Sequence, residues 1–108
     1  MIKIAILGLG NLGTALARVW LVGGVDEVAG WTIEEEVYDS ITADGVNRKY
    51  LDHVSLEGLK VTMDIEAAVD GAEIVALAVP SSVVLTVVDS VLPYLKDCLL
   101  YTSDAADE

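Results

Sequence analysis

Residues 3–17, KIAILGLGNLGTALA, combine an apolar run, a turn with three glycines and a segment with helical spacing. The run Ile2–Leu7 ends at a glycine, which is typical of a short buried strand in a parallel sheet. From Asn11 onward the spacing predicts a helix that ends at Gly23-Gly24. The face expected to be buried consists of Leu12, Ala15, Leu16, Val19 and Trp20. The sequence therefore predicts a strand, a tight turn and a helix in direct succession.

The three glycines have the spacing Gly-x-Gly-x-x-Gly, and each has its own physical role in such a turn. Gly8 permits the tight exit from the strand, and Gly13 lets the helix pack closely against it. Gly10, which has no side chain, lets a pyrophosphate approach the backbone at the helix N-terminus. The motif predicts a dinucleotide-binding site in this strand–turn–helix context, and a glycine-rich turn without a ligand is the alternative.

The rest of the chain continues the alternation of strands and helices. Further strands are expected at Glu27–Trp31, Lys60–Thr62 and Glu73–Val79, and helices at Glu34–Ile41, Ile65–Val69 and from Ser81 to Leu95. An irregular link spans Thr42–Leu59. This order predicts an α/β fold of the Rossmann type, with a parallel sheet, helices on both faces and an end after about the fifth strand. Residues 1–97 are expected to form one NAD(P)-binding domain.

Two further segments bear on the cofactor. The second strand is followed by Thr32-Ile33-Glu34-Glu35-Glu36, where carboxylates favour the 2′-hydroxyl of NAD over the 2′-phosphate of NADP. These acids also suit the first turn of a helix, and the two interpretations are compatible. After the buried strand at Glu73–Val79, Pro80 and Ser81 are expected either to contact the cofactor or merely to begin a helix. NAD is therefore the expected cofactor, with NADP as the alternative.

The composition excludes several classes of function. The 108 residues carry a formal charge of −12, which disfavours nucleic acid and anionic membranes as partners. A single cysteine, Cys98, and a single histidine, His53, predict that there is no metal site. No apolar stretch is long enough for membrane insertion, and no secretory leader is visible. We therefore expect a cytoplasmic protein.

Together with the glycine turn, two segments resemble the N-terminal domain of NAD(P)-dependent glycerol-3-phosphate dehydrogenases. These segments are Asn47-Arg48-Lys49-Tyr50-Leu51 and Ala78-Val79-Pro80-Ser81, and the resemblance runs from Ile2 to about Leu95. It implies hydride transfer between NAD(P)H and dihydroxyacetone phosphate, giving sn-glycerol 3-phosphate, by an enzyme that is a homodimer when full length. Pyrroline-5-carboxylate reductase and a non-catalytic NAD(H)-binding module are the alternatives.

The resemblance also implies individual contacts. Asn11 and Leu12 would meet the pyrophosphate through the backbone, and Thr32 and Ile33 would border the adenosine ribose. Thr32 departs from the family, which often has Arg or His there, and Leu12 replaces a common aromatic residue. The expected cofactor-binding residues are Gly8, Gly10, Asn11, Leu12, Gly13, Trp31, Thr32, Ile33, Pro80 and Ser81.

No catalytic residue is expected within this sequence. The family has a lysine in a Thr-Lys-Gly turn after the fifth strand, where this chain has Thr102-Ser103-Asp104-Ala105. The helical substrate domain that follows in the family is absent from the sequence, so we expect the chain alone to be inactive. Residues 98–108 resemble the translation of a transposase sequencing adapter, which predicts a non-native tail. A genuine acidic tail is the alternative.

Overall fold

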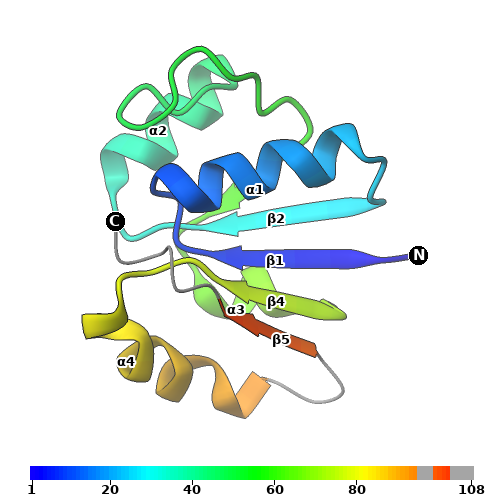
Figure 1. The fold of residues 1–108 in the computed structure, drawn as a ribbon, viewed down its shortest axis with the longest axis vertical. Helices are drawn as coiled ribbons and strands as arrows, with labels where there is room; N and C mark the ends of the chain where they lie inside the picture. The colour runs from blue at the N-terminus through cyan, green and yellow to red at the C-terminus, as the bar shows by residue number, and fades with distance from the viewer. Residues whose placement is uncertain (95–98, 103–108) are drawn as a thin grey trace.

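The computed structural model describes residues 1–94 and 99–102 of the chain. Within them, five strands form one parallel sheet in the order β3-β2-β1-β4-β5 (Figure 1). The strands are β1 Lys3–Leu7, β2 Glu27–Trp31, β3 Lys60–Thr62, β4 Ile74–Leu77 and β5 Leu99–Thr102. The central strand β1 pairs with both β2 and β4, so that Leu7 lies beside Trp31 and Leu77. The predicted parallel sheet is confirmed.

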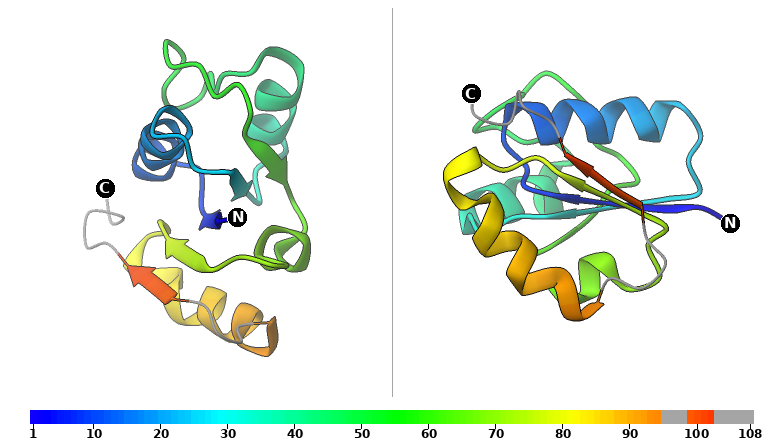
Figure 2. Two further views of the ribbon diagram at one scale, coloured as in Figure 1. Left: turned by 90° about the vertical axis from the view of Figure 1, so that its right-hand side faces the viewer. Right: turned by 60° about the horizontal axis from the view of Figure 1, so that its bottom comes forward.

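The helices cover both faces of this sheet, as predicted. They are α1 Asn11–Val22, α2 Glu35–Asp44, α3 Ile65–Val69 and α4 Ser81–Val91, followed by a 3₁₀ turn at Leu92–Tyr94. Helices α1 and α2 lie on one face, and α3 and α4 lie on the other (Figure 2). Alternate β1 residues divide between the two cores, with Ile4 and Ile6 in one and Ala5 and Leu7 in the other. The fold is therefore a doubly wound Rossmann sheet.

The buried face of α1 differs from the predicted one. Its fully buried residues are Gly13, Thr14 and Ala17, whereas Val19 is 61% exposed. Gly13 lies against the carbonyl oxygen of Gly8, where no larger residue fits, and Trp20 is only partly buried against the core. The helix does end at Gly23, but the left-handed conformation belongs to Gly24, with φ of 85°. Periodicity located the helix correctly and its inner face in part: Leu16 and Trp20 pack against the core as predicted, whereas Val19 does not.

Helix α4 begins at Ser81, as predicted, but ends earlier than predicted. Pro80 occupies the N-cap, and it makes no side-chain cap hydrogen bond. The α-helix ends at Val91, and a 3₁₀ turn containing Pro93 follows, because proline lacks the N–H that would continue the helix. Helix α3, by contrast, has a side-chain cap, since Glu66 N donates to Asp64 Oδ1 at 3.1 Å.

Helix α2 and strand β4 also have bounds that differ from the predicted ones. Helix α2 runs to Asp44 rather than to Ile41, and Gly45 ends it in the left-handed conformation with φ of 71°. Strand β4 is shorter than the predicted Glu73–Val79. The predicted domain boundary at residue 97 and most of the tail 98–108 lie outside the described residues and stay predictions.

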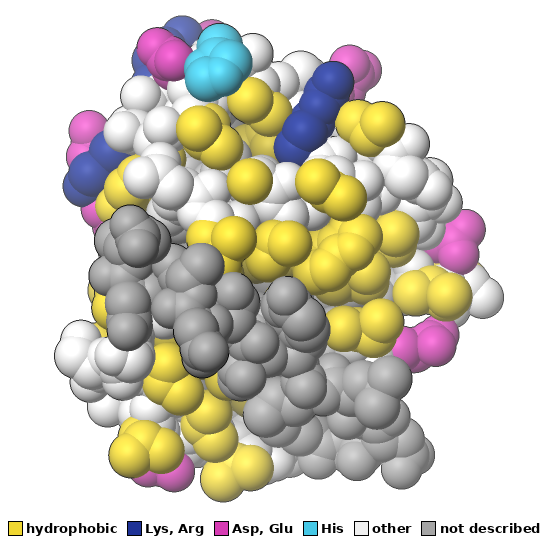
Figure 3. Space-filling view, in the orientation of Figure 1, with side chains coloured by type: hydrophobic (Ala, Val, Ile, Leu, Met, Phe, Trp, Pro, Cys, Tyr) yellow, Lys and Arg dark blue, Asp and Glu magenta, His cyan; other side chains and the backbone are white. Residues whose placement is uncertain are grey.

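Apolar side chains are also exposed on the described surface. Val22, Leu85 and Leu92 are 66%, 77% and 54% exposed. Apolar side chains gather in the middle of one face, with acidic groups towards its margin (Figure 3). The high apolar content of the chain is therefore only partly accounted for by the buried sheet.

Candidate cofactor-binding cleft

A cleft of about 450 Å³ opens at the carboxyl ends of β1, β2 and β4. This is the edge at which a doubly wound sheet binds its ligands, beside the point where the strand order reverses. All of the predicted cofactor residues except Gly13 and Ser81 line the cleft. Its lining residues are Gly8, Leu9, Gly10, Asn11, Leu12, Trp31, Thr32, Ile33, Glu34, Tyr50, Ala78, Val79, Pro80, Val83, Thr86, Val87 and Ser90.

Two of the three motif glycines are required by the protein's own packing. Gly8 has φ of 109°, and a Cβ atom there would lie 2.6 Å from the carbonyl oxygen of Ala78. A Cβ atom on Gly13 would lie only 1.8 Å from the carbonyl oxygen of Gly8. Gly13 thus sets the distance between α1 and the turn below it, which explains why it does not line the cleft.

Gly10 is different, because nothing within the chain requires a glycine there. Its φ of −82° is accessible to any residue, and a Cβ atom would have no heavy atom within 4 Å. The open space lies at the cleft, where Gly10, Asn11 and Leu12 form the start of α1. A ligand that must approach the backbone closely is the physical reason for glycine at this position. The site therefore fits the pyrophosphate of a dinucleotide.

The N-terminus of α1 supplies the electrostatics that such a ligand needs. Gly10 is its N-cap, no side chain caps the helix, and the first turn contains no acidic residue. The first N–H groups of a helix have no partner within it, and the helix dipole favours negative charge there. The backbone of Asn11 and Leu12 is thus available to an anionic group in the cleft.

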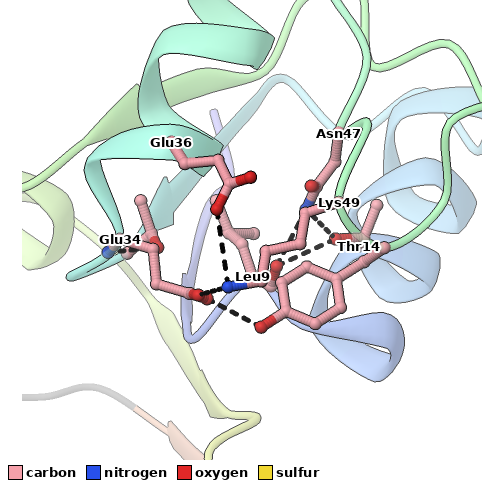
Figure 4. Close-up of polar contacts among 8 residues, drawn as sticks. Leu9, Thr14, Glu34, Glu36, Asn47 and Lys49 are labelled. Carbon is pink, nitrogen blue, oxygen red and sulfur yellow. Dashed lines mark hydrogen bonds and ion pairs between the residues drawn. The ribbon is translucent and has the colours of Figure 1, made fainter.

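A buried side chain fixes the glycine turn from behind. Asn47, which is fully buried, donates from Nδ2 to the Leu9 carbonyl oxygen and to Thr14 Oγ1, both at 2.9 Å (Figure 4). Thr14 Oγ1 in turn donates to the same carbonyl at 3.3 Å. Asn47 Oδ1 is buried without a hydrogen-bond partner among the described residues. The segment after α2 is therefore tied to the turn that would hold the pyrophosphate.

At the other end of the cleft, charged side chains meet beside the end of β2. The Glu34 carboxylate accepts from Lys49 Nζ and, at 2.8 Å, from the Tyr50 hydroxyl (Figure 4). Lys49 Nζ also lies 3.6 Å from Glu36 Oε1. The Lys49 hydrogen bond, helped by that of Tyr50, lowers the pKa of Glu34 although partial burial opposes the shift. Glu34 is therefore ionised at neutral pH.

Hydrogen bonds between side chains and the backbone hold this end of the site in place. The Glu34 N–H donates to Thr32 Oγ1 at 3.0 Å, and Thr32 is almost fully buried. Trp31 Nε1 donates to the carbonyl oxygen of Met63 at 3.1 Å, which ties β2 to the end of β3. Thr32 thus shapes the chain between β2 and α2, and its hydroxyl is already engaged.

Several lining residues were missed by the sequence predictions. Tyr50 was noted only as part of a resemblance, and Glu34 only as one of three acids. Four residues of α4, Val83, Thr86, Val87 and Ser90, also line the cleft. Their helical spacing places them on one face, so periodicity within the predicted helix could have found them. No local pattern reveals that Tyr50 lies beside Glu34.

The sequence of residues 3–103 matches the profile of the family described as NAD-dependent glycerol-3-phosphate dehydrogenase N-terminus. The chain belongs to this family. The match confirms the predicted family and a cofactor of the NAD(P) type, and it decides against pyrroline-5-carboxylate reductase. None of the described helices is both long and apolar enough to cross a membrane.

Individual glycerol-3-phosphate dehydrogenases show how much of the protein is present. The chain is 42% identical over 75% of its length to the NAD(P)+ enzyme of Nocardia farcinica, of which it spans 24%. It is 39% identical over 94% of its length to the enzyme of Desulfotalea psychrophila, of which it spans 30%. The crystal structure of the Coxiella burnetii enzyme superposes with a TM-score of 0.87 at 33% identity, covering 94% of this chain and 32% of that one. The chain thus corresponds to the N-terminal NAD-binding domain and spans a quarter to a third of these relatives.

Proposed function

We propose that the chain binds NAD(H) in the cleft at the carboxyl edge of the sheet. The observation that carries this proposal is the open space at Gly10, where the chain itself gives no steric or conformational reason for a glycine. The N–H groups of Asn11 and Leu12 would hold the pyrophosphate. Trp31, Thr32 and Ile33 would border the adenosine ribose, and Pro80 would line the opposite side. Contact with Ser81 stays a prediction.

The intact protein is proposed to transfer hydride between NAD(H) and the pair dihydroxyacetone phosphate and sn-glycerol 3-phosphate. The names of its relatives and the family match support this proposal. When bound, the cofactor supplies or accepts the hydride, and the residues named above bind and orient it. The chain alone is proposed to bind without turnover, because the resemblance puts the reacting lysine where this sequence has Ser103, outside the described residues.

The cytoplasmic location and a homodimer of the intact protein are also proposals. They rest on the resemblance to the family, and the acidic charge of the chain is compatible with a soluble enzyme that acts on small molecules. An assay of the full-length gene product for NADH oxidation with dihydroxyacetone phosphate tests the substrate. Sedimentation of the same product tests the dimer.

Titration of the 108-residue chain with NADH, followed by nicotinamide fluorescence, tests the binding proposal. Wild type is expected to bind, Gly10→Ala to bind more weakly and Gly10→Val to lose binding, because each added carbon occupies the approach of the pyrophosphate. Both variants are expected to lose only a few degrees in Tm, because no heavy atom lies within 4 Å of the new Cβ and the poorer N-cap costs about 1 kcal/mol at most. A folded wild-type chain that binds neither NADH nor NADPH, or a Gly10→Val variant with full affinity, would contradict the proposal.

A further inference from the structure

The ammonium group of Lys49 lies next to the adenosine end of the proposed site, and the predictions from sequence did not include it. Lys49 comes from the segment between α2 and β3, and its Nζ contacts the carboxylates of Glu34 and Glu36. Its Nζ also lies 5.6 Å from the centre of the Tyr50 ring. Glu34 and Tyr50 line the cleft, whereas Lys49 does not. Lys49 therefore lies directly behind a carboxylate that a bound ligand would meet.

The charges of this cluster do not cancel. Two carboxylates, Glu34 and Glu36, share one ammonium group, so the cluster carries a net negative charge. Of the two acids only Glu34 faces the cleft, and the side chain of Glu36 is 70% exposed. A ligand at this end of the site thus meets the negative charge of Glu34, with the positive charge of Lys49 already engaged.

Thr32 does not provide another way to distinguish NAD from NADP. The resemblance gives this position an arginine or histidine in many relatives, but here the residue is a buried threonine whose hydroxyl accepts from the Glu34 N–H. A neutral, engaged hydroxyl neither attracts nor repels a phosphate. The described side chains that can distinguish a ribose hydroxyl from a ribose phosphate at this edge are therefore Glu34 and Lys49.

The acids after Ile33 already predict a preference for NAD. Beyond that preference, we propose that Lys49 is a latent binding group for the 2′-phosphate of NADP, which the Glu34 carboxylate keeps occupied. The proposal rests on the proposed function, because it assigns a role to residues of the same cleft. A carboxylate accepts the hydrogen bond of the ribose 2′-hydroxyl and repels a phosphate at the same place. Lys49 and Tyr50 hold that carboxylate in position, and once Glu34 is neutral Lys49 keeps only the longer contact to the exposed Glu36 as its ion pair.

The test compares NADH and NADPH affinities of the chain by nicotinamide fluorescence, for wild type and three variants. Glu34→Gln keeps the shape of the side chain and removes its charge, and it is expected to shift the affinity ratio towards NADPH by about tenfold or more. Glu36→Gln is the matched control, because it removes a charge from the same lysine outside the cleft. Its ratio is expected to stay within about twofold of wild type. Glu34→Gln with Lys49→Met is expected to lose most of the gain for NADPH.

The outcomes separate the parts of the proposal. Wild-type binding of NADH with equal shifts for Glu34→Gln and Glu36→Gln would overturn it and leave the proposed function standing. A full gain for NADPH that survives Lys49→Met would refute the role of Lys49, since repulsion by Glu34 would then account for the whole preference. A folded wild-type chain that binds neither cofactor would overturn the proposed function and this inference with it.

Discussion

The two ends of the cleft are built in opposite ways. At the phosphate end the ligand would meet backbone, and the controlling residues are glycines whose role is to have no side chain. At the adenosine end it would meet side chains, with a carboxylate held by a lysine and a tyrosine. Steric fit governs the first end and charge governs the second. The first is therefore intolerant of added atoms, and the second is tolerant of substitution but sensitive to charge.

Because of this difference, the phosphate end contributes to binding of either cofactor, and the adenosine end contributes the selectivity between NAD and NADP. Every Rossmann site needs a close approach to the pyrophosphate, so the glycine turn indicates binding but not which cofactor is bound. Selectivity between NAD and NADP depends on a single phosphate group at the ribose, which only the adenosine end can sense. Variants at the phosphate end should thus change stability or overall affinity, whereas variants at the adenosine end should change mainly the choice of cofactor.

The largest expected effect is that of Gly13→Ala, which breaks the phosphate end by sterics alone. The added Cβ would lie 1.8 Å from the Gly8 carbonyl oxygen, a backbone atom that cannot move aside without shifting α1 or the turn. We expect a loss of about 3 kcal/mol or more in the free energy of unfolding, measured by urea denaturation.

Gly10→Ala is the matched control for that variant, because it adds the same methyl group three residues earlier into open space. Its free energy of unfolding is expected to fall by about 1 kcal/mol at most, since alanine is a poorer N-cap than glycine, although its affinity for NADH falls. If Gly13→Ala were as stable as Gly10→Ala, the close packing of α1 against the glycine turn would not be the constraint described here.

A smaller effect is expected at Asn47, which supports the phosphate end from the segment that also carries Lys49. Asn47→Ala removes two buried hydrogen bonds and leaves the Leu9 carbonyl with only the longer one from Thr14. We expect a loss of about 2 kcal/mol in the free energy of unfolding, moderated because the unpartnered Oδ1 is removed as well. Urea denaturation measures it.

Asn47→Asp sharpens the same prediction. It keeps the size of the side chain but places a carboxylate oxygen against the Leu9 carbonyl, so it should destabilise the fold more than Asn47→Ala does. Equal stability of Asn47→Asp and wild type would show that the donated hydrogen bonds to Leu9 and Thr14 are not important.

The same contrast explains what could be predicted from the sequence. The strand, the turn and the start of α1 follow from contiguous residues, and the glycine spacing even distinguishes the roles of Gly8, Gly10 and Gly13. The inner face of α1 was predicted only in part, because its most buried residues are the small Gly13, Thr14 and Ala17, and the close contact of Gly13 with the Gly8 carbonyl requires a small residue there. A hydrophobic pattern carries no information about that contact.

The adenosine end could be predicted only in part. The acids that follow Ile33 were visible, and they supported a preference for NAD. The approach of Lys49 and Tyr50 to Glu34 depends on the path of the irregular segment after α2, where Gly45 ends the helix and Asn47 is held beneath the glycine turn. Such contacts join residues distant in sequence, so local propensity does not specify them.

The smallest expected effect concerns stability at the adenosine end. The pKa of Glu34 lies below its ordinary value of 4.5, so the ionised side chain stabilises the fold above that pH and loses its effect as the pH falls through the lowered pKa. Glu34→Gln is therefore expected to melt a few degrees at most below wild type at about pH 7, because exposed pairs contribute little. The two melting temperatures should converge as the pH falls below the lowered pKa of Glu34, where the wild-type carboxylate is protonated. Thermal unfolding monitored by circular dichroism across this range checks the prediction. A difference that persists unchanged in acid would mean that the shape of the side chain, and not its charge, holds Lys49 and Tyr50 at this end of the cleft.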